Sequence, residues 1–119
     1  MSSPFLESTL LGACPALRDT WDAHRRTFGA TSAPDDRALL DAVRRHVVGL
    51  LVTGRVAEFA RFTRAMEREL RDADPMLDDL LREELLHPLA ADAAAAGIAR
   101  AQIEPHLGPR VARAWPDSR

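Results

Sequence analysis

The sequence predicts an all-helical fold of about five to seven segments, packed as an orthogonal or irregular bundle. Apolar residues recur every three or four positions, prolines stand where helices would begin, and glycines stand where they would end. No stretch alternates polar and apolar residues for long enough to form a strand. The 119 residues are expected to form one domain, 1–119, because a chain of this length buries about two-thirds of its surface.

Two helical segments are expected before residue 30. A short segment over 5–12 follows Pro4, and a second begins at the pair Cys14–Pro15 and ends at Gly29. The apolar face of the second segment repeats at helical spacing through Leu17, Trp21, His24 and Phe28.

A longer helix is expected over 34–53, opened by a capping arrangement of Ser32 with Asp35 and ended by Gly54. Val48 and Val52 lie outside its main apolar stripe, so this helix is apolar on more than one side. The next helix carries a stripe formed by Val56, Phe59, Phe62, Thr63, Met66 and Leu70. Its outer surface is expected to carry the ion pairs Glu67–Arg71 and Arg68–Asp72.

The pair Asp74–Pro75 marks another helix start, with Asp74 as the cap. Pro88 is expected to kink or end this helix, because proline lacks the N–H donor and its ring clashes one turn back. An alanine-rich helix then ends at Gly97, and short segments are expected over 98–107 and 110–115. We expect the core to include Trp21, Phe28, Phe59, Phe62, Leu80 and Trp115.

The composition argues against several functional classes. One cysteine is too few for a disulfide framework or a cysteine zinc site. No run approaches the ~18 apolar residues of a membrane span, and residues 1–9 lack the basic start of a secretory signal, so a cytoplasmic location is expected. A net charge of −2, from 16 basic and 18 acidic residues, argues against a nucleic-acid binder. We therefore expect neither a membrane nor a nucleic acid as partner.

Glu84 and His87 raise the hypothesis of a metal enzyme. On a helical wheel Glu84 falls between Leu77 and Leu80 in the apolar face, and Glu-x-x-His is the spacing that di-iron helical bundles use. Such a site needs a second pair of this kind, and no other histidine has an acid three residues before it. The simpler alternative is a buried Glu84–His87 pair or an arginine partner. No metal and no cofactor are expected.

Nucleophilic catalysis has little support in the sequence. Cys14 could act only where a histidine and an acid converge on it, and its neighbours Ala13 and Pro15 favour a packing role. His24 and His46 flank apolar faces, where a hydrogen-bonded boundary role is the simpler interpretation. The chain lacks a glycine-rich phosphate loop, Gly-x-Ser-x-Gly and His-Glu-x-x-His. We expect no catalytic residue and no enzymatic activity.

Charge is distributed unevenly along the chain. Residues 72–92 contain seven acids and one arginine, a net charge of −6, which leaves +4 for the remainder. An acidic face on a rigid helical domain can steer a basic partner, whereas the alternative is a solvated surface whose acids favour a helix N-terminus. A DNA-reading helix after Gly54 is the weaker interpretation, because glutamates interleave with its arginines. The predicted partner-binding residues are Asp74, Asp78, Asp79, Glu83 and Asp92.

Two local patterns flank the Gly54 turn and the acidic helix. They are Pro15, Leu17, Trp21, His24, Phe28 and Gly29 near the start, and Leu107, Gly108, Pro109 and Trp115 near the end. In this order they resemble a family of small bacterial all-helical domains of unknown function, immunity-protein-like in character, and the resemblance covers most of the chain. Because proteins of this kind often occur near secreted-toxin and immunity loci, the resemblance implies an immunity-type inhibitor without catalytic residues.

These observations favour a non-enzymatic protein-binding module, specifically an immunity protein that neutralises a cognate bacterial toxin through its acidic helical face. Two alternatives stay open. One is a homodimeric scaffold or regulatory protein in which Val48, Val52 and Leu86 pair with a second chain. The other is a metal-dependent helical enzyme centred on Glu84 and His87.

Overall fold

The computed structural model describes residues 10–19, 23 and 36–115. Every regular element in these residues is a helix, which confirms the all-helical prediction. The first described elements are the helical residues 10–13 and the 3-10 turn η1 (Pro15–Leu17). The predicted face through Trp21, His24 and Phe28 and the predicted cap at 32–35 lie outside the described residues.

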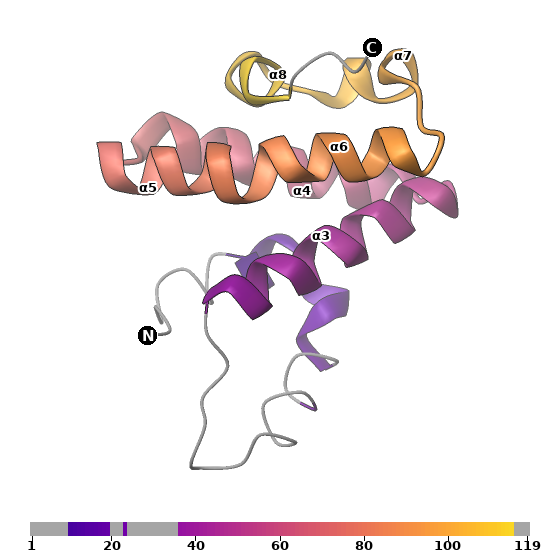
Figure 1. The fold of residues 1–119 in the computed structure, drawn as a ribbon, viewed down its shortest axis with the longest axis horizontal. Coiled ribbons are helices and arrows are strands. Elements are labelled where there is room, and N and C mark those ends of the chain that lie inside the picture. The colour runs from indigo at the N-terminus through magenta and orange to yellow at the C-terminus, as the bar shows by residue number, and fades with distance from the viewer. Residues whose placement is uncertain (1–9, 20–22, 24–35, 116–119) are drawn as a thin grey trace.

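Helices α3 (Asp36–Val52) and α4 (Val56–Asp72) come next and are joined by a tight turn at Gly54 (Figure 1). Gly54 has a φ of 75°, which glycine adopts without strain. The N–H of Arg55 donates to the Leu50 carbonyl at 2.8 Å, and the N–H of Gly54 donates to the Leu51 carbonyl at 3.3 Å. This Schellman motif ends α3 where the sequence predicted.

A long helical segment then runs through α5 (Pro75–Asp79), η2 (Leu80–Leu86) and α6 (His87–Ala95). Asp74 caps it as predicted, because its side chain accepts a hydrogen bond from the Leu77 N–H at 2.8 Å.

The helix does not end at Pro88, which corrects that part of the prediction. The segment before the proline is a π-helix, in which the His87 N–H bonds to the Arg82 carbonyl five residues back. A π-turn is wider than an α-turn, so it accommodates the proline ring and the missing donor. The helix therefore continues past Pro88 to Ala95.

The chain reverses at Gly97, whose φ is 85°. The Ile98 N–H donates to the Ala93 carbonyl and the Gly97 N–H to the Ala94 carbonyl, both at 3.0 Å, which forms a second Schellman motif. The short elements after this turn lie above the long helix in Figure 1. They are α7 (Arg100–Ile103), η3 (Glu104–His106) and α8 (Pro109–Ala114).

One hydrophobic cluster joins these elements. The helix α6 packs against α3, and α4 packs against both α3 and α8. Of the predicted core residues within the described part, Phe59, Phe62 and Trp115 are buried and Leu80 is half-buried, whereas Val56 of the predicted stripe is exposed. The largest fully buried side chains are Phe59, Phe62, Leu10, Leu39, Met66, Leu81, Leu85, Leu86, Leu89 and Val43.

Glu67 corrects the predicted surface ion pairs. Its carboxylate does not pair with Arg71, which instead lies 3.4 Å from Asp72. Glu67 accepts hydrogen bonds from the backbone N–H groups of Arg110, at 2.9 Å, and Val111, at 3.3 Å. It thereby satisfies donors at the start of α8 that have no partner within that helix. Helical spacing within α4 could not reveal a partner on another helix.

Two further contacts fix the C-terminal elements on α4. The ring of Phe59 meets Trp115 edge to face, with centroids 6.1 Å apart, and meets His106 in the same way at 6.3 Å. The buried hydroxyl of Thr63 donates to the His106 carbonyl at 2.7 Å. The position predicted as part of an apolar stripe therefore carries a satisfied polar contact.

Within the described part of the chain, no helix is both long enough and apolar enough to cross a membrane. The cytoplasmic location stays a prediction.

Gly108 tests the contact between α4 and α8. A Cβ at this position would lie 2.8 Å from the Glu67 carboxyl carbon, so Gly108→Ala should displace the carboxylate from the α8 N–H groups. We expect a loss of about 1–2 kcal/mol in the free energy of unfolding, measured by urea denaturation. Gly49→Ala is the control, since a Cβ there meets nothing within 4 Å and should be neutral or stabilising. Equal stability of Gly108→Ala and the native chain would contradict this role of Glu67.

Candidate functional site

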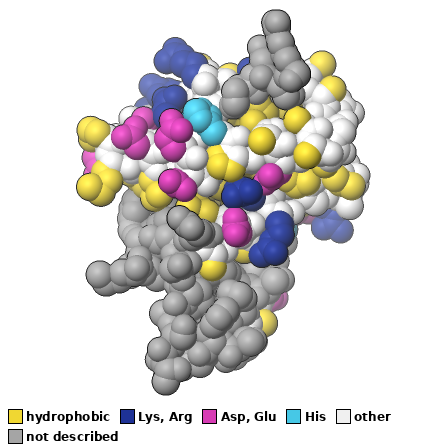
Figure 2. All heavy atoms as spheres, in the orientation of Figure 1, with side chains coloured by type: hydrophobic (Ala, Val, Ile, Leu, Met, Phe, Trp, Pro, Cys, Tyr) yellow, Lys and Arg dark blue, Asp and Glu magenta, His cyan; other side chains and the backbone are white. Residues whose placement is uncertain are grey.

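The predicted partner-binding carboxylates are distributed along the long helix. Figure 2 shows acidic side chains gathered toward the α5 end, beside a histidine. Asp74, Asp79 and Glu83 are exposed, whereas Asp78 and Asp92 are half-buried.

Most of these carboxylates have partners within the chain. Arg82 Nε donates to Asp78 Oδ2 at 2.9 Å, and His87 Nδ1 lies 3.4 Å from Glu83 Oε2. In contrast, the carboxylates of Asp79 and Glu84 make no hydrogen bond or ion pair with any residue that the structure describes. Of these two unpaired residues, Asp79 is one of the predicted partner-binding residues, whereas Glu84 was predicted to lie in the apolar face.

Asp92 lies apart from the other predicted residues. It is thirteen residues beyond Asp79, which corresponds to roughly 20 Å along a helix. Arg44 of α3 donates from Nε to Asp92 Oδ2 at 2.9 Å and from Nη1 to Asp41 Oδ1 at 3.1 Å. These groups line a pocket of about 400 Å³ between α3 and α6. The charge of Asp92 is therefore engaged in the contact between the two helices.

Glu84 is exposed, so its predicted place in the apolar face is wrong. The wheel assumed 3.6 residues per turn, but the π-helical turn of η2 takes in more residues and shifts the helical phase of the positions after it. Leu85 and Leu86 are buried in its place. Among the described residues, no group of three His, Cys, Asp or Glu side chains could hold a metal ion, so Glu84 and His87 have no further ligands there.

The same phase shift overturns the surface predicted for a homodimer. Leu86 is fully buried in the core of its own chain and cannot contact a second one. Val48 is half-buried against that core, and Val52, at the end of α3, is 60% exposed. The three side chains therefore do not form a common exposed surface.

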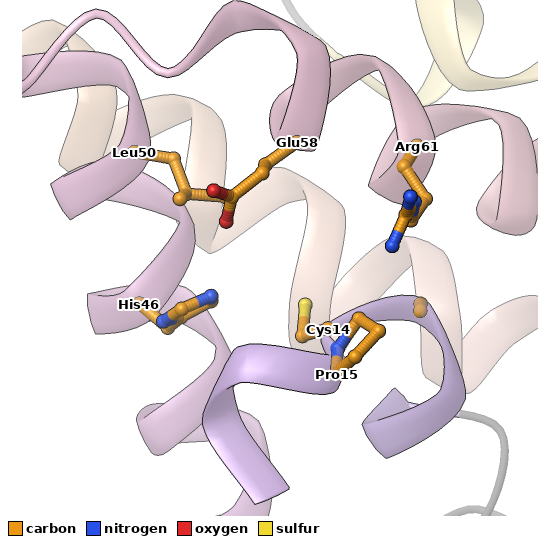
Figure 3. A pocket seen from close by; sticks show the side chains of 7 residues that line it. Cys14, Pro15, His46, Leu50, Glu58 and Arg61 are labelled. Atoms are coloured by element: carbon orange, nitrogen blue, oxygen red, sulfur yellow. The ribbon is translucent and has the colours of Figure 1, made fainter.

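A second candidate site lies between residues 13–15, α3 and α4. Figure 3 shows four polar side chains from these elements directed toward one pocket of about 320 Å³. They are Cys14, His46, Glu58 and Arg61, and the remaining lining is Ala13, Pro15 and Leu50. The structure thus places a histidine and an acid at the same pocket as Cys14. The sequence alone could not show whether they would converge there.

The electrostatics of this pocket do not favour a nucleophilic thiol. Burial raises the pKa of the Cys14 thiol to about 12, and the charge of Glu58 contributes to the increase. Burial lowers the pKa of His46, with Glu58 opposing and Arg55 supporting that shift. At neutral pH the thiol is therefore protonated and the imidazole neutral, whereas a reactive cysteine needs the thiolate. No hydrogen bond joins Cys14 to His46 among the described residues.

The sequence predicts a packing role for Cys14 and a boundary role for His46. Glu58 and Arg61 are among the alternating charges of the helix after Gly54, and their spacing predicts no pocket. One signal was present, because His46 and Arg61 lie at nearly equal distances on either side of the Gly54 turn. Residues placed in this way face each other in a helical hairpin. Nothing in the local sequence indicated that Cys14 would join them.

The chain has no significant match among known protein-family models, curated proteins or solved structures. The immunity-type role implied by the family resemblance therefore stays a prediction.

The pH dependence of stability tests the environment of Cys14. The folded-state pKa is raised above the ordinary value of 9.0, so the contribution of this group to stability is complete below pH 9 and is lost as the pH rises toward 12. We expect about 1–3 kcal/mol to be lost by pH 11 in urea unfolding experiments. Cys14→Ala should remove most of this slope.

The composition of the chain makes that experiment easy to interpret. All 16 basic side chains are arginine and there is no tyrosine, so no other side chain titrates between pH 9 and 11. Equal pH slopes for the native chain and Cys14→Ala would contradict a buried, protonated thiol.

Proposed function

We propose that this chain is a non-enzymatic protein-binding module that presents the α5 end of its long helix to a partner with a basic surface. The observation that carries the proposal is the pair of exposed carboxylates, Asp79 and Glu84, that have no counter-charge among the described residues. Unpaired carboxylates make the local electrostatic potential negative and attract a positively charged surface.

The neighbouring acids contribute unequally to this surface. Asp78 and Glu83 lie beside the unpaired carboxylates. Arg82 holds Asp78 in an i,i+4 ion pair, and Glu83 lies 3.4 Å from His87 Nδ1. Asp74 caps the helix and stays exposed. We therefore assign partner contact first to Asp79 and Glu84, with Asp74, Asp78 and Glu83 as supporting charges. Asp92 belongs to the α3–α6 contact.

Met76 supplies an apolar group next to these charges. Its side chain is 82% exposed, the highest value among the exposed large hydrophobic residues of the described part. It lies one helical turn before Asp79, so both can face the same partner. Interfaces gain most of their affinity from a few apolar or arginine anchors that become desolvated, and methionine adapts well to an apolar pocket. The surface around Met76 therefore combines charges that attract a basic partner with an apolar side chain that can be buried against it.

The helix that carries this surface is held firmly by the core. Leu81, Leu85 and Leu86 of η2 are fully buried, and η2 packs against α3 and α8. A side chain on a fixed backbone loses less conformational freedom when it binds. This rigidity suits an inhibitor that must match the surface of one target.

Within this class, the specific role we propose is that of an immunity protein for a bacterial toxin. The resemblance of the sequence to small bacterial helical domains supports this role. A toxin that acts on nucleic acid carries a basic substrate surface, because phosphate contacts require Lys and Arg side chains. An acidic face would bind that surface and block access to it. The proposed complex forms in the cytoplasm.

Charge reversal tests the assignment. A partner captured from the native host should be purified, and its affinity for the native chain measured by calorimetry at low and high salt. We expect Asp79→Arg and Glu84→Arg each to weaken binding by about tenfold at low salt, and salt to weaken the native complex.

Asp19→Arg is the matched control, since Asp19 lies after η1, is exposed and, like Asp79 and Glu84, makes no hydrogen bond or ion pair with any residue that the structure describes. It should change the affinity by less than about twofold. Unchanged affinity for both α5–η2 variants at low salt would contradict the proposed binding face. Loss of binding in all three variants would indicate a general effect of charge.

A further inference from the structure

The pocket beside Cys14 contains one carboxylate and one guanidinium that do not pair with each other. Glu58 and Arg61 stand three residues apart on α4, and both side chains are directed toward the pocket (Figure 3). Glu58 makes one ion pair in the described part of the chain, with Arg55 at 3.6 Å, and both partners are exposed to solvent. Arg61 makes none there. The pocket therefore has separated charges of opposite sign and a net charge of zero.

The remaining lining of the pocket is uncharged. Cys14 is 3% exposed, and its thiol makes no hydrogen bond with any described residue. A neutral His46 offers one hydrogen-bond donor and one acceptor. Ala13, Pro15 and Leu50 add apolar surface. The thiol is a weak hydrogen-bond donor that packs as a small apolar group, so Cys14 adds to the apolar lining.

We propose that this pocket binds a small zwitterion of the amino-acid type, with its carboxylate on Arg61 and its ammonium group on Glu58. A lone anion would meet the carboxylate of Glu58, and a lone cation would meet the guanidinium of Arg61. A molecule with both charges satisfies each group and leaves neither repelled.

The dimensions of the pocket agree with a ligand of this size. Its volume of about 320 Å³ lies near the lower limit for small-molecule pockets. The Cβ atoms of residues three apart on a helix are about 5–6 Å from each other, so one amino acid can contact both Glu58 and Arg61. The apolar groups of Ala13, Pro15 and Leu50 favour an aliphatic side chain on the ligand.

Two other uses of the same residues fit less well. A metal ion would need three ligands in range, and the described residues contain no such group. Covalent catalysis would need a thiolate, and burial keeps Cys14 protonated. A reversible ligand uses the groups in the protonation states that they already have.

Calorimetry with leucine and two leucine analogues tests the proposal. Isopentylamine lacks the carboxylate, and 4-methylpentanoate lacks the ammonium group. We expect leucine to bind with a dissociation constant below about 1 mM and each analogue to bind at least about tenfold more weakly. In NMR spectra of the same samples, the ring resonances of His46 should shift, whereas those of His87, outside the pocket, should not.

Four variants assign the binding to this pocket. Glu58→Gln and Arg61→Gln should each weaken leucine binding by at least about tenfold, since each removes one charge contact. Glu69→Gln and Arg64→Gln are matched controls on the same helix, outside the pocket, and should bind as the native chain does. Circular dichroism should show the same helical content in all four, because none of these residues is buried.

The proposal would be overturned if no standard amino acid shifts His46 at about 10 mM. It would also be overturned if an analogue with one charge binds as tightly as its parent, or if neither pocket variant weakens binding. These results are independent of the acidic face on α5 and η2, which uses none of the same residues.

Discussion

The absence of an N–H on Pro88 determines the course of the long helix, and both the core and the acidic face depend on it. An α-helix could not continue through this proline without a clash and a lost hydrogen bond. The chain instead forms a π-turn over Leu80–Leu86 and reaches Ala95. The extra residue in that turn brings Leu85 and Leu86 into the core together. It also directs Glu84 to solvent, where it lies among the other acids.

The charged residues of the chain fall into groups with different physical roles. Glu67 and Asp92 serve the fold, because they join α4 to α8 and α6 to α3. Asp79 and Glu84 have no partner in the described residues and so are free to attract one from outside. Glu58 and Arg61 line a pocket and do not pair with each other. Net charge per segment, which is all that a sequence provides, cannot separate these roles.

The acidic face and the pocket beside Cys14 differ in how far the sequence could predict them. The acidic segment was evident from the order of charges along the chain, and Asp74 was correctly identified as a cap because its bond to Leu77 spans only three residues. The pocket was not predicted, because Cys14 lies 44 residues before Glu58 and 47 before Arg61 in the chain. Helical periodicity relates neighbours within a turn or two, so it could not bring these residues together.

The sequence by itself determined the helical class, the two turns at Gly54 and Gly97 and most of the buried positions on α4. These features depend on backbone conformation and on 3.6-residue spacing, which are local properties. Only the tertiary structure decided the phase of the helix around Pro88, the partner of Glu67 and the convergence of residues on Cys14. In each case the outcome depended on which of several locally allowed arrangements best filled the core, and that competition involves residues far apart in the chain.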